Sequence, residues 1–299
     1  MKNVILITLL LTTPLVSNAD LNIFTCEPEW AALAQELGGK KIKVKSATNA
    51  LQDPHYIQAR PSLISKVGRA DLIVCSGAQL EIGWLPMLLR KGNNPGVLPG
   101  STGFLEASMY VKRLDVAVNS DRSQGDVHPQ GNPHIQTNPH NIQLVATVMS
   151  ERMAQLDRDN ADFYRQRLVN FSQRWAAAIT AWEQRAANLR GKRVIAHHKS
   201  WVYLENWLDL VEVATLESVP GIPPTASHLG NLLNRFGGDK GADFIIRAPF
   251  QSEKPSKWLS ERTGIPAVLL PLTVGGTEQS SDLFNWFDDI LNRLLGAEG

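Results

Sequence analysis

Short apolar runs that favour β-strands alternate with helical patterns along most of the chain, and this alternation constrains the fold more than any other feature. In the first half, strands are predicted at residues 22–26, 41–46, 71–75 and 115–118, with helices at 29–37, 60–68 and 83–90. In the second half, strands are predicted at 193–196, 211–216, 244–247 and 267–270, with helices at 226–236, 254–263 and 282–295. This order predicts an α/β fold with parallel sheets and crossover helices.

Residues 161–190 contain no glycine or proline, and their apolar side chains recur at spacings of three, four and five. A helix of this length would extend ~45 Å, which is more than one small domain needs. We therefore expect two parallel-sheet lobes joined by one long α-helix, with a functional cleft between the lobes. The predicted division is an export signal at 1–19, an N-terminal lobe at 20–155, a connecting helix at 156–191 and a C-terminal lobe at 192–299.

The first 19 residues have the pattern of a cleavable export signal. Lys2 precedes an apolar run at residues 4–11, and Ser17-Asn18-Ala19 suits a signal peptidase. The run is shorter than the ~20 apolar residues of a permanent membrane helix. No cysteine stands directly after the cleavage point, where a lipid would be attached, so we expect a periplasmic protein without a lipid anchor.

The remaining chain contains two cysteines, Cys26 and Cys75, each at the end of a predicted strand. Two parallel strands that end side by side would bring the sulfurs within bonding range, and an oxidising compartment would let them form a disulfide. Two buried free thiols are the alternative. The net charge of +1 gives no reason to expect nucleic acid as a partner.

Three of the seven histidines lie in loop-like settings beside predicted strands or helices: His55, His134 and His198. In α/β lobes, ligands gather at the carboxyl ends of strands, so these side chains are expected to face the cleft. Neutral imidazole nitrogen suits Zn²⁺, which usually takes four ligands. Taken singly, each histidine is more often a surface or capping residue than a metal ligand.

Three motifs in this order resemble those of the periplasmic zinc/manganese-binding proteins of ATP-driven metal importers. They are Asp53-Pro54-His55 with Arg60-Pro61-Ser62, Gly131-Asn132-Pro133-His134 with Asn138-Pro139, and His198-x-x-Trp201-x-Tyr203. The resemblance covers essentially the whole mature chain. It implies that His55, His134 and His198 bind the metal, and that the protein delivers it to the membrane permease of an ABC importer. We also expect a monomer, with a periplasmic zinc chaperone as an additional partner.

The fourth ligand is left open by the sequence. Members of the family often carry an aspartate just after the last strand, but this chain continues Leu270-Pro271-Leu272-Thr273-Val274-Gly275-Gly276. Asp282, Glu278 or water could complete the site, and Asp282 is also a candidate helix N-cap. Asp53 is expected to orient His55 or to form a turn, and not to bind the metal. His128 is either an accessory metal ligand or a solvated loop residue, whereas His197 is expected to point away from the site.

A secreted zinc metallohydrolase is the main alternative, because three histidines with an open fourth position also describe catalytic zinc. Such an enzyme needs a general base near the bound water, and the chain has no His-Glu-x-x-His motif. Aromatic neighbours such as Tyr56, Trp201 and Tyr203 suit a dry wall around an enclosed ion. We therefore expect a binding protein and not an enzyme. Three imidazoles favour Zn²⁺, with Mn²⁺ as the alternative because it prefers more oxygen ligands.

Overall fold

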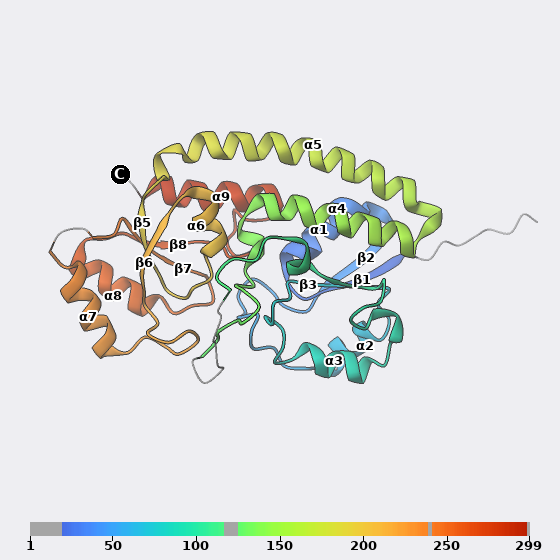
Figure 1. The fold of residues 1–299 in the computed structure, drawn as a ribbon, viewed down its shortest axis with the longest axis horizontal. Coiled ribbons are helices and arrows are strands. Elements are labelled where there is room, and N and C mark those ends of the chain that lie inside the picture. The colour runs from blue at the N-terminus through green and yellow to red at the C-terminus, as the bar shows by residue number, and fades with distance from the viewer. Residues whose placement is uncertain (1–19, 117–124, 239–240, 298–299) are drawn as a thin grey trace, which may run out of the picture.

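The computed structural model describes residues 20–116, 125–238 and 241–297, and these form two α/β lobes side by side (Figure 1). Each lobe contains a four-stranded parallel sheet, with strand order β2-β1-β3-β4 in the first and β6-β5-β7-β8 in the second. The strands are β1 (Leu21–Thr25), β2 (Ile42–Ser46), β3 (Leu72–Cys75), β4 (Phe104–Glu106), β5 (Arg193–Ala196), β6 (Val211–Thr215), β7 (Phe244–Arg247) and β8 (Ala267–Leu269). The predicted fold class is confirmed.

Helices cover both faces of the first sheet. Because side chains alternate along a strand, Ile23 of β1 packs toward α1 (Pro28–Gly38) and α4 (Pro139–Leu156). The next residue, Phe24, packs on the opposite face toward α2 (Pro61–Val67) and α3 (Leu85–Gly92). The first lobe is therefore a three-layer structure whose strands are buried on both faces.

The second lobe repeats this arrangement. Val194 of β5 belongs to the same apolar cluster as residues of α6 (Val202–Leu208) and α9 (Leu283–Gly296). Ile195 packs on the other face with residues of α7 (Ala226–Phe236) and α8 (Glu253–Thr263).

The predicted long helix is present as α5 (Ala161–Arg185), which is continued by a 3-10 turn at Ala186–Leu189. Figure 1 shows it running across both lobes. The Trp175 side chain contacts helices of both lobes. Its indole Nε1 donates to the Pro139 carbonyl at the start of α4 at 2.9 Å. Its ring centroid lies 4.9 Å from that of Phe284 in α9. The helix is thus fixed to the first lobe and to the second.

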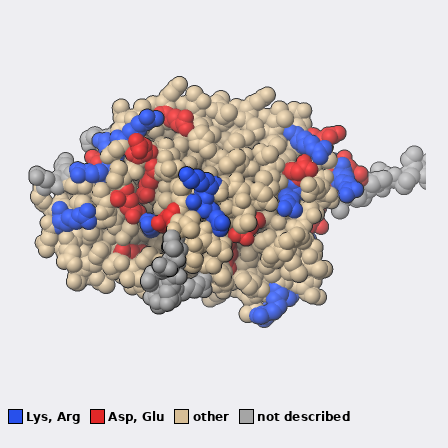
Figure 2. Space-filling model, in the orientation of Figure 1, with Lys and Arg blue, Asp and Glu red and all other residues tan. Residues whose placement is uncertain are grey.

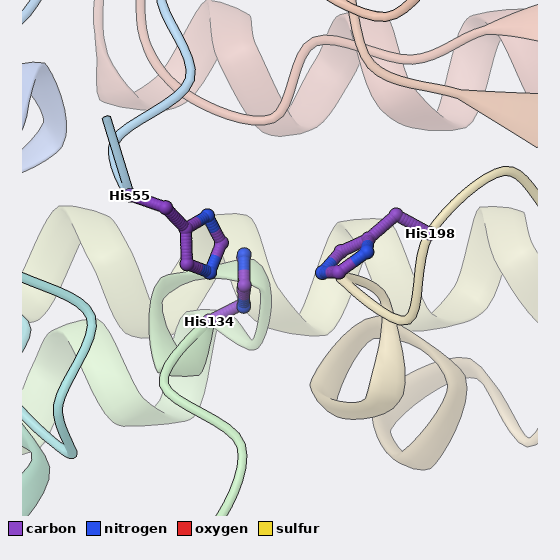
Figure 3. A group of neighbouring side chains, drawn as sticks. All are labelled: His55, His134 and His198. Atoms are coloured by element: carbon purple, nitrogen blue, oxygen red, sulfur yellow. The ribbon is translucent and has the colours of Figure 1, made fainter. Parts of the chain in front are cut away.

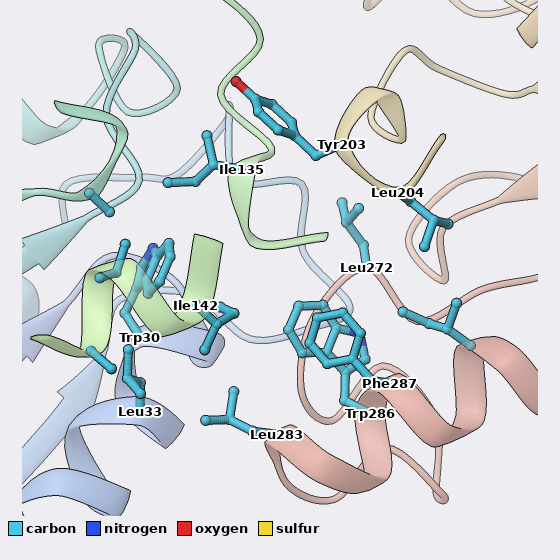
Figure 4. Packing of buried hydrophobic residues seen from close by; sticks show 14 of the residues in the cluster. Trp30, Leu33, Ile135, Ile142, Tyr203, Leu204, Leu272, Leu283, Trp286 and Phe287 are labelled. Atoms are coloured by element: carbon cyan, nitrogen blue, oxygen red, sulfur yellow. The ribbon is translucent and has the colours of Figure 1, made fainter. Parts of the chain in front are cut away.

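One hydrophobic core extends through both lobes on the side covered by α5. Figure 4 shows residues of α1 and α4 close to residues of α9, with Leu33 and Ile142 near Leu283 and Trp286. All four side chains are buried. The boundary between the lobes is therefore packed like a domain interior at this side, and the lobes separate only around the loops at the opposite side.

Two details of the sequence prediction meet different outcomes. Cys26 and Cys75 follow or end the neighbouring strands β1 and β3 and form a disulfide, so that prediction is confirmed. The strand predicted at 115–118 is wrong for Asp115 and Val116, and residues 117–118 lie outside the described part of the chain. Asp115 has φ +53°, which is incompatible with a strand, and the fourth strand is instead the short β4 at Phe104–Glu106.

The surface carries both signs of charge. Figure 2 shows Lys and Arg side chains interspersed with Asp and Glu on the face drawn there, which agrees with the net charge of +1. Among the described residues, none of the helices is both long enough and apolar enough to span a membrane.

Candidate metal centre

Three imidazoles from loops far apart in the sequence converge between the lobes. Figure 3 shows His55, His134 and His198 pointing toward one another, and one nitrogen of each lies within 4.8 Å of the other two. His55 follows β2, His198 follows β5, and His134 precedes the turn that leads into α4. His55 and His198 thus lie beyond the carboxyl ends of strands, as the sequence predicts.

His55 is oriented by a carboxylate two residues earlier in the chain. Asp53 Oδ1 accepts hydrogen bonds from the backbone N–H of His55 at 3.0 Å and from its ring Nδ1 at 2.7 Å. Because an ionised carboxylate only accepts hydrogen bonds, Nδ1 carries the proton and Nε2 retains its lone pair. Asp53 therefore has the orienting role expected from the sequence.

His134 is the most deeply buried of the three, with 1% of its surface exposed. Asn132 Oδ1 accepts from its backbone N–H at 3.0 Å and lies 3.3 Å from Nδ1, while Asn132 Nδ2 donates to the Lys199 carbonyl at 2.7 Å. Asn132 thus links the His134 loop to the His198 loop across the cleft. Nε2 of His134 is buried and has no hydrogen-bond partner among the described residues.

His198 is held by Glu217, a residue that the sequence analysis did not single out. Glu217 Oε2 accepts from His198 Nδ1 at 2.7 Å and from the backbone N–H of Gly221 at 2.7 Å. The neighbouring His197 Nε2 lies 3.8 Å from the other carboxylate oxygen and is not in the converging group. Glu217 lies just beyond β6, and its position near His198 follows from the pairing of β5 with β6, which the sequence does not display.

Burial favours the neutral form of His134. Desolvation, followed by repulsion from His55 and His198, holds the pKa of His134 well below its usual value. Burial acts to raise the pKa of Asp53, but its hydrogen bond and charge interaction with His55 outweigh this effect and leave that pKa lowered. An ionised Asp53 and a neutral His134 suit a cation site.

The carboxylates predicted as possible fourth ligands are not brought to the histidines. Asp282 caps α9, where Oδ1 accepts from the backbone N–H groups of Phe284 and Asn285, each at 2.9 Å. Glu278 is exposed in the loop before this helix. Neither residue belongs to the converging group among the described residues.

His128 approaches the site from the first lobe. Its Nε2 lies 3.2 Å from Nε2 of His55, although it is not within 4.8 Å of all three converging nitrogens. By contrast, His140 is exposed at the start of α4 and pairs with Glu183 of α5 at 2.8 Å. His228 lies in α7 and contacts the Thr215 carbonyl.

Only part of the expected aromatic wall encloses the site. Trp201 and Tyr203 are buried, and the Tyr203 hydroxyl donates to the Asn132 carbonyl at 2.9 Å. Tyr56 is 65% exposed and instead donates to the Asp126 carboxylate, so its assignment to a dry wall is wrong. A cavity of about 490 Å³ lined by Asp53, His55, His198 and Glu217 connects the site with the surface.

The fold resembles solved structures of metal-binding proteins. A crystal structure of ZnuA superimposes with a TM-score of 0.74 at 21% identity, covering 92% of this chain and 99% of that one. A manganese-bound periplasmic metal binding protein from Candidatus Liberibacter asiaticus also gives a TM-score of 0.74, at 16% identity, covering 94% of this chain and all of the other.

Sequence comparison identifies the class. The manganese ABC transporter substrate-binding lipoprotein PsaA of Streptococcus pneumoniae is 22% identical over 255 residues, covering 84% of this chain and 79% of the relative. A metal ABC transporter substrate-binding lipoprotein of Lactococcus lactis is 21% identical over 266 residues, covering 85% and 79%. This protein is the substrate-binding component of a metal ABC transporter. The model of the periplasmic zinc-uptake complex component A, ZnuA, matches residues 23–297, and the chain belongs to this family. Its members are not enzymes and work with a membrane permease and an ATPase.

Proposed function

We propose that this chain captures Zn²⁺ in the cleft through Nε2 of His55, His134 and His198, and delivers the ion to the permease of its importer. The observation that carries this proposal is the common orientation of the three rings, each of which has an oxygen atom facing its Nδ1. Asp53, Asn132 and Glu217 each face the Nδ1 atom of one ring, which leaves Nε2 of each ring available to a metal ion. Three preoriented imidazole nitrogens are a strong donor set for a borderline cation.

Zinc is favoured over manganese by the chemistry of these donors. Imidazole suits Zn²⁺, whereas Mn²⁺ prefers carboxylate, carbonyl and water oxygen. The two carboxylates that the sequence offers as a fourth ligand, Glu278 and Asp282, are exposed and lie outside the converging group. Manganese is the second candidate, since PsaA is named as a manganese protein and the Liberibacter protein was solved with manganese.

The cellular setting belongs to the same proposal. Residues 1–19, the expected export signal, lie outside the described residues; we propose that they direct the chain to the periplasm. The mature chain acts as a monomer with lobes at 20–155 and 192–299 joined by the connecting helix, and a zinc chaperone is a further partner.

Titration of the metal-free chain with Zn²⁺ and with Mn²⁺, against a chromophoric chelator, tests the proposal. We expect one tightly bound Zn²⁺ per chain and weaker Mn²⁺ binding. His55→Ala, His134→Ala and His198→Ala should each weaken Zn²⁺ binding by about 100-fold or more, since loss of an orienting partner alone costs about 10- to 100-fold. His140→Ala is the control, because this exposed histidine pairs with Glu183 away from the site. Tight zinc binding by all three variants would refute the proposed site, and zinc-dependent hydrolysis would favour the metallohydrolase alternative.

A further inference from the structure

His128 approaches the converging histidines at His55, although its ring nitrogens are not within 4.8 Å of all three. It comes from the segment 125–131 of the first lobe, and its Nε2 lies 3.2 Å from Nε2 of His55, with the ring centroids 5.3 Å apart. The other ring nitrogen, Nδ1, is buried without a hydrogen-bond partner among the described residues. The His128 imidazole is thus half-buried and directed at a predicted ligand.

The separation of these two nitrogens matches the geometry of a zinc site. Bonds of ~2.0–2.1 Å in a tetrahedral site place neighbouring ligand nitrogens ~3.3–3.4 Å apart. Since Asp53 fixes the proton of His55 on Nδ1, its Nε2 is an acceptor, and His128 Nε2–H is the donor of this contact. To bind a cation through Nε2, His128 would shift its proton from Nε2 to Nδ1, and the Nε2 lone pairs of His55 and His128 would then both face the cation.

The segment that carries His128 is held in place from two sides. The Asp126 carboxylate accepts from the Tyr56 hydroxyl, with O···O distances of 2.7 and 2.9 Å, which ties the segment to the His55 loop. The backbone N–H of Asp126 donates to the Pro220 carbonyl of the second lobe at 2.9 Å. Gly125 makes this approach possible, because a Cβ at this position, with φ +93°, would lie 2.1 Å from the Pro220 carbonyl oxygen.

We infer that His128 is the fourth ligand of the cleft, giving an all-nitrogen site of His55, His128, His134 and His198. This inference rests on the proposed function. Four neutral imidazoles leave the two positive charges of Zn²⁺ uncompensated, and the carboxylates of Asp53 and Glu217, bonded to His55 and His198, offset them. A site without an oxygen ligand discriminates against Mn²⁺ more strongly than a site completed by a carboxylate.

The test compares three variants of the full chain with the unmodified protein. Competition for Zn²⁺ is measured for His128→Ala, His55→Ala and the control His140→Ala, and ¹⁵N-histidine NMR follows the ring nitrogens of the unmodified protein during zinc titration. We expect His128→Ala to bind one Zn²⁺ about 10- to 100-fold more weakly, with less discrimination against Mn²⁺. The Nε2 signal of His128 should shift together with those of His55, His134 and His198.

Tyr56→Phe provides a second variant that retains all four imidazoles. Loss of its hydroxyl frees the Asp126 carboxylate, so Zn²⁺ should dissociate faster into excess chelator while the stoichiometry stays at one. If His55→Ala loses zinc but His128→Ala binds as tightly as the unmodified chain, with no shift of the His128 signal, the four-histidine site is wrong and the three-histidine function stands. If His55→Ala also binds normally, the proposed function itself fails.

Discussion

Glu217 Oε2 and His198 Nδ1 lie 2.7 Å apart, so a carboxylate from beyond β6 fixes the ring of a proposed metal ligand beyond β5. The same oxygen also accepts from the backbone N–H of Gly221. A carboxylate that is itself anchored to the backbone holds the imidazole in one orientation and increases its basicity. The metal affinity of the cleft should therefore depend on a residue that does not contact the ion.

Replacing Glu217 with alanine should weaken Zn²⁺ binding by about 10- to 100-fold without changing the stoichiometry. Glu217→Gln retains an oxygen that can accept from Nδ1 but removes the charge. Its zinc affinity should lie between those of Glu217→Ala and the unmodified chain. Chelator competition measures both affinities. Glu183→Gln is the matched control, because this exposed carboxylate contacts His140 and the Trp207 indole and none of the converging histidines. Equal affinities for Glu217→Ala and the unmodified chain would contradict this role.

His197→Ala and His198→Ala should differ strongly although the residues are adjacent. His198 contributes to the converging nitrogens, whereas His197 only lies 3.8 Å from Glu217. We expect His197→Ala to change zinc affinity by less than about 10-fold, through Glu217. Calorimetric titration of both variants tests this, and similar losses would mean that His197 contacts the ion.

The three histidines that converge were predicted from the sequence, but only one of the residues that orient them was. Asp53 was predictable because it is two residues from His55. Glu217 is 19 positions from His198, and only the pairing of two strands brings them together. Asp282 illustrates the opposite case. An aspartate at the start of a predicted helix near the cleft suits either a ligand or an N-cap, and local backbone N–H groups bind it in this structure.

Strand prediction failed for a related reason. β4 has three residues, Phe104–Glu106, which is too short for an alternating pattern, and it follows a segment rich in glycine and proline. Its identity as a strand depends on pairing with β3, where Ile73 lies opposite Phe104. The apolar residues near Asp115 resemble a strand in composition, but Asp115 adopts a positive φ.

The disulfide between Cys26 and Cys75 should contribute substantially to stability. The cysteines are 49 residues apart, and closing a loop of this length adds ~4 kcal/mol on the chain-entropy model. The double variant Cys26→Ser/Cys75→Ser should therefore unfold at a lower denaturant concentration while retaining zinc binding. Mass spectrometry of the non-reduced protein should show two fewer hydrogens than the reduced form, and two free thiols in the exported protein would contradict the prediction.

Buried carboxyl groups in the first lobe should make stability depend on pH. Burial raises the pKa of Glu29 to about 7, although a hydrogen bond from Thr273 of the second lobe acts to lower it. The folded pKa is above the unfolded value, so this contribution to stability is fully present below the unfolded pKa of 4.5 and is lost as the pH rises to about 7 and beyond. The shift corresponds to about 3 kcal/mol.

Glu29→Gln keeps an acceptor for the Thr273 hydroxyl and removes the titration. Relative to the unmodified chain, this variant should gain stability between pH 5 and pH 8, as measured by urea unfolding at each pH with the metal absent. Glu36→Gln, a change at a half-buried position on the same helix, should alter the free energy of unfolding by an amount that is nearly constant with pH, although it weakens a pair with Arg174. If the free energies of unfolding of Glu29→Gln and the unmodified chain also differ by the same amount at every pH, Glu29 does not carry the pH dependence.

The last prediction concerns how the protein changes when zinc binds. A hinge needs flexible segments between its rigid parts, but α5 is an uninterrupted helix that Trp175 anchors to both α4 and α9. The shared core beside it would have to be broken for the lobes to rotate apart. We therefore expect the radius of gyration from small-angle scattering to change little on zinc binding.

Hydrogen exchange should slow at 53–56 and 125–134, where the ligands and the Asp126 contact lie. The loop 275–282 should change less, because Gly275 N–H already donates to the Ser280 carbonyl at 2.6 Å and the Asp282 side chain caps α9. A marked contraction on zinc binding, or protection gained along α5, would contradict the rigid connection and favour closure by a hinge.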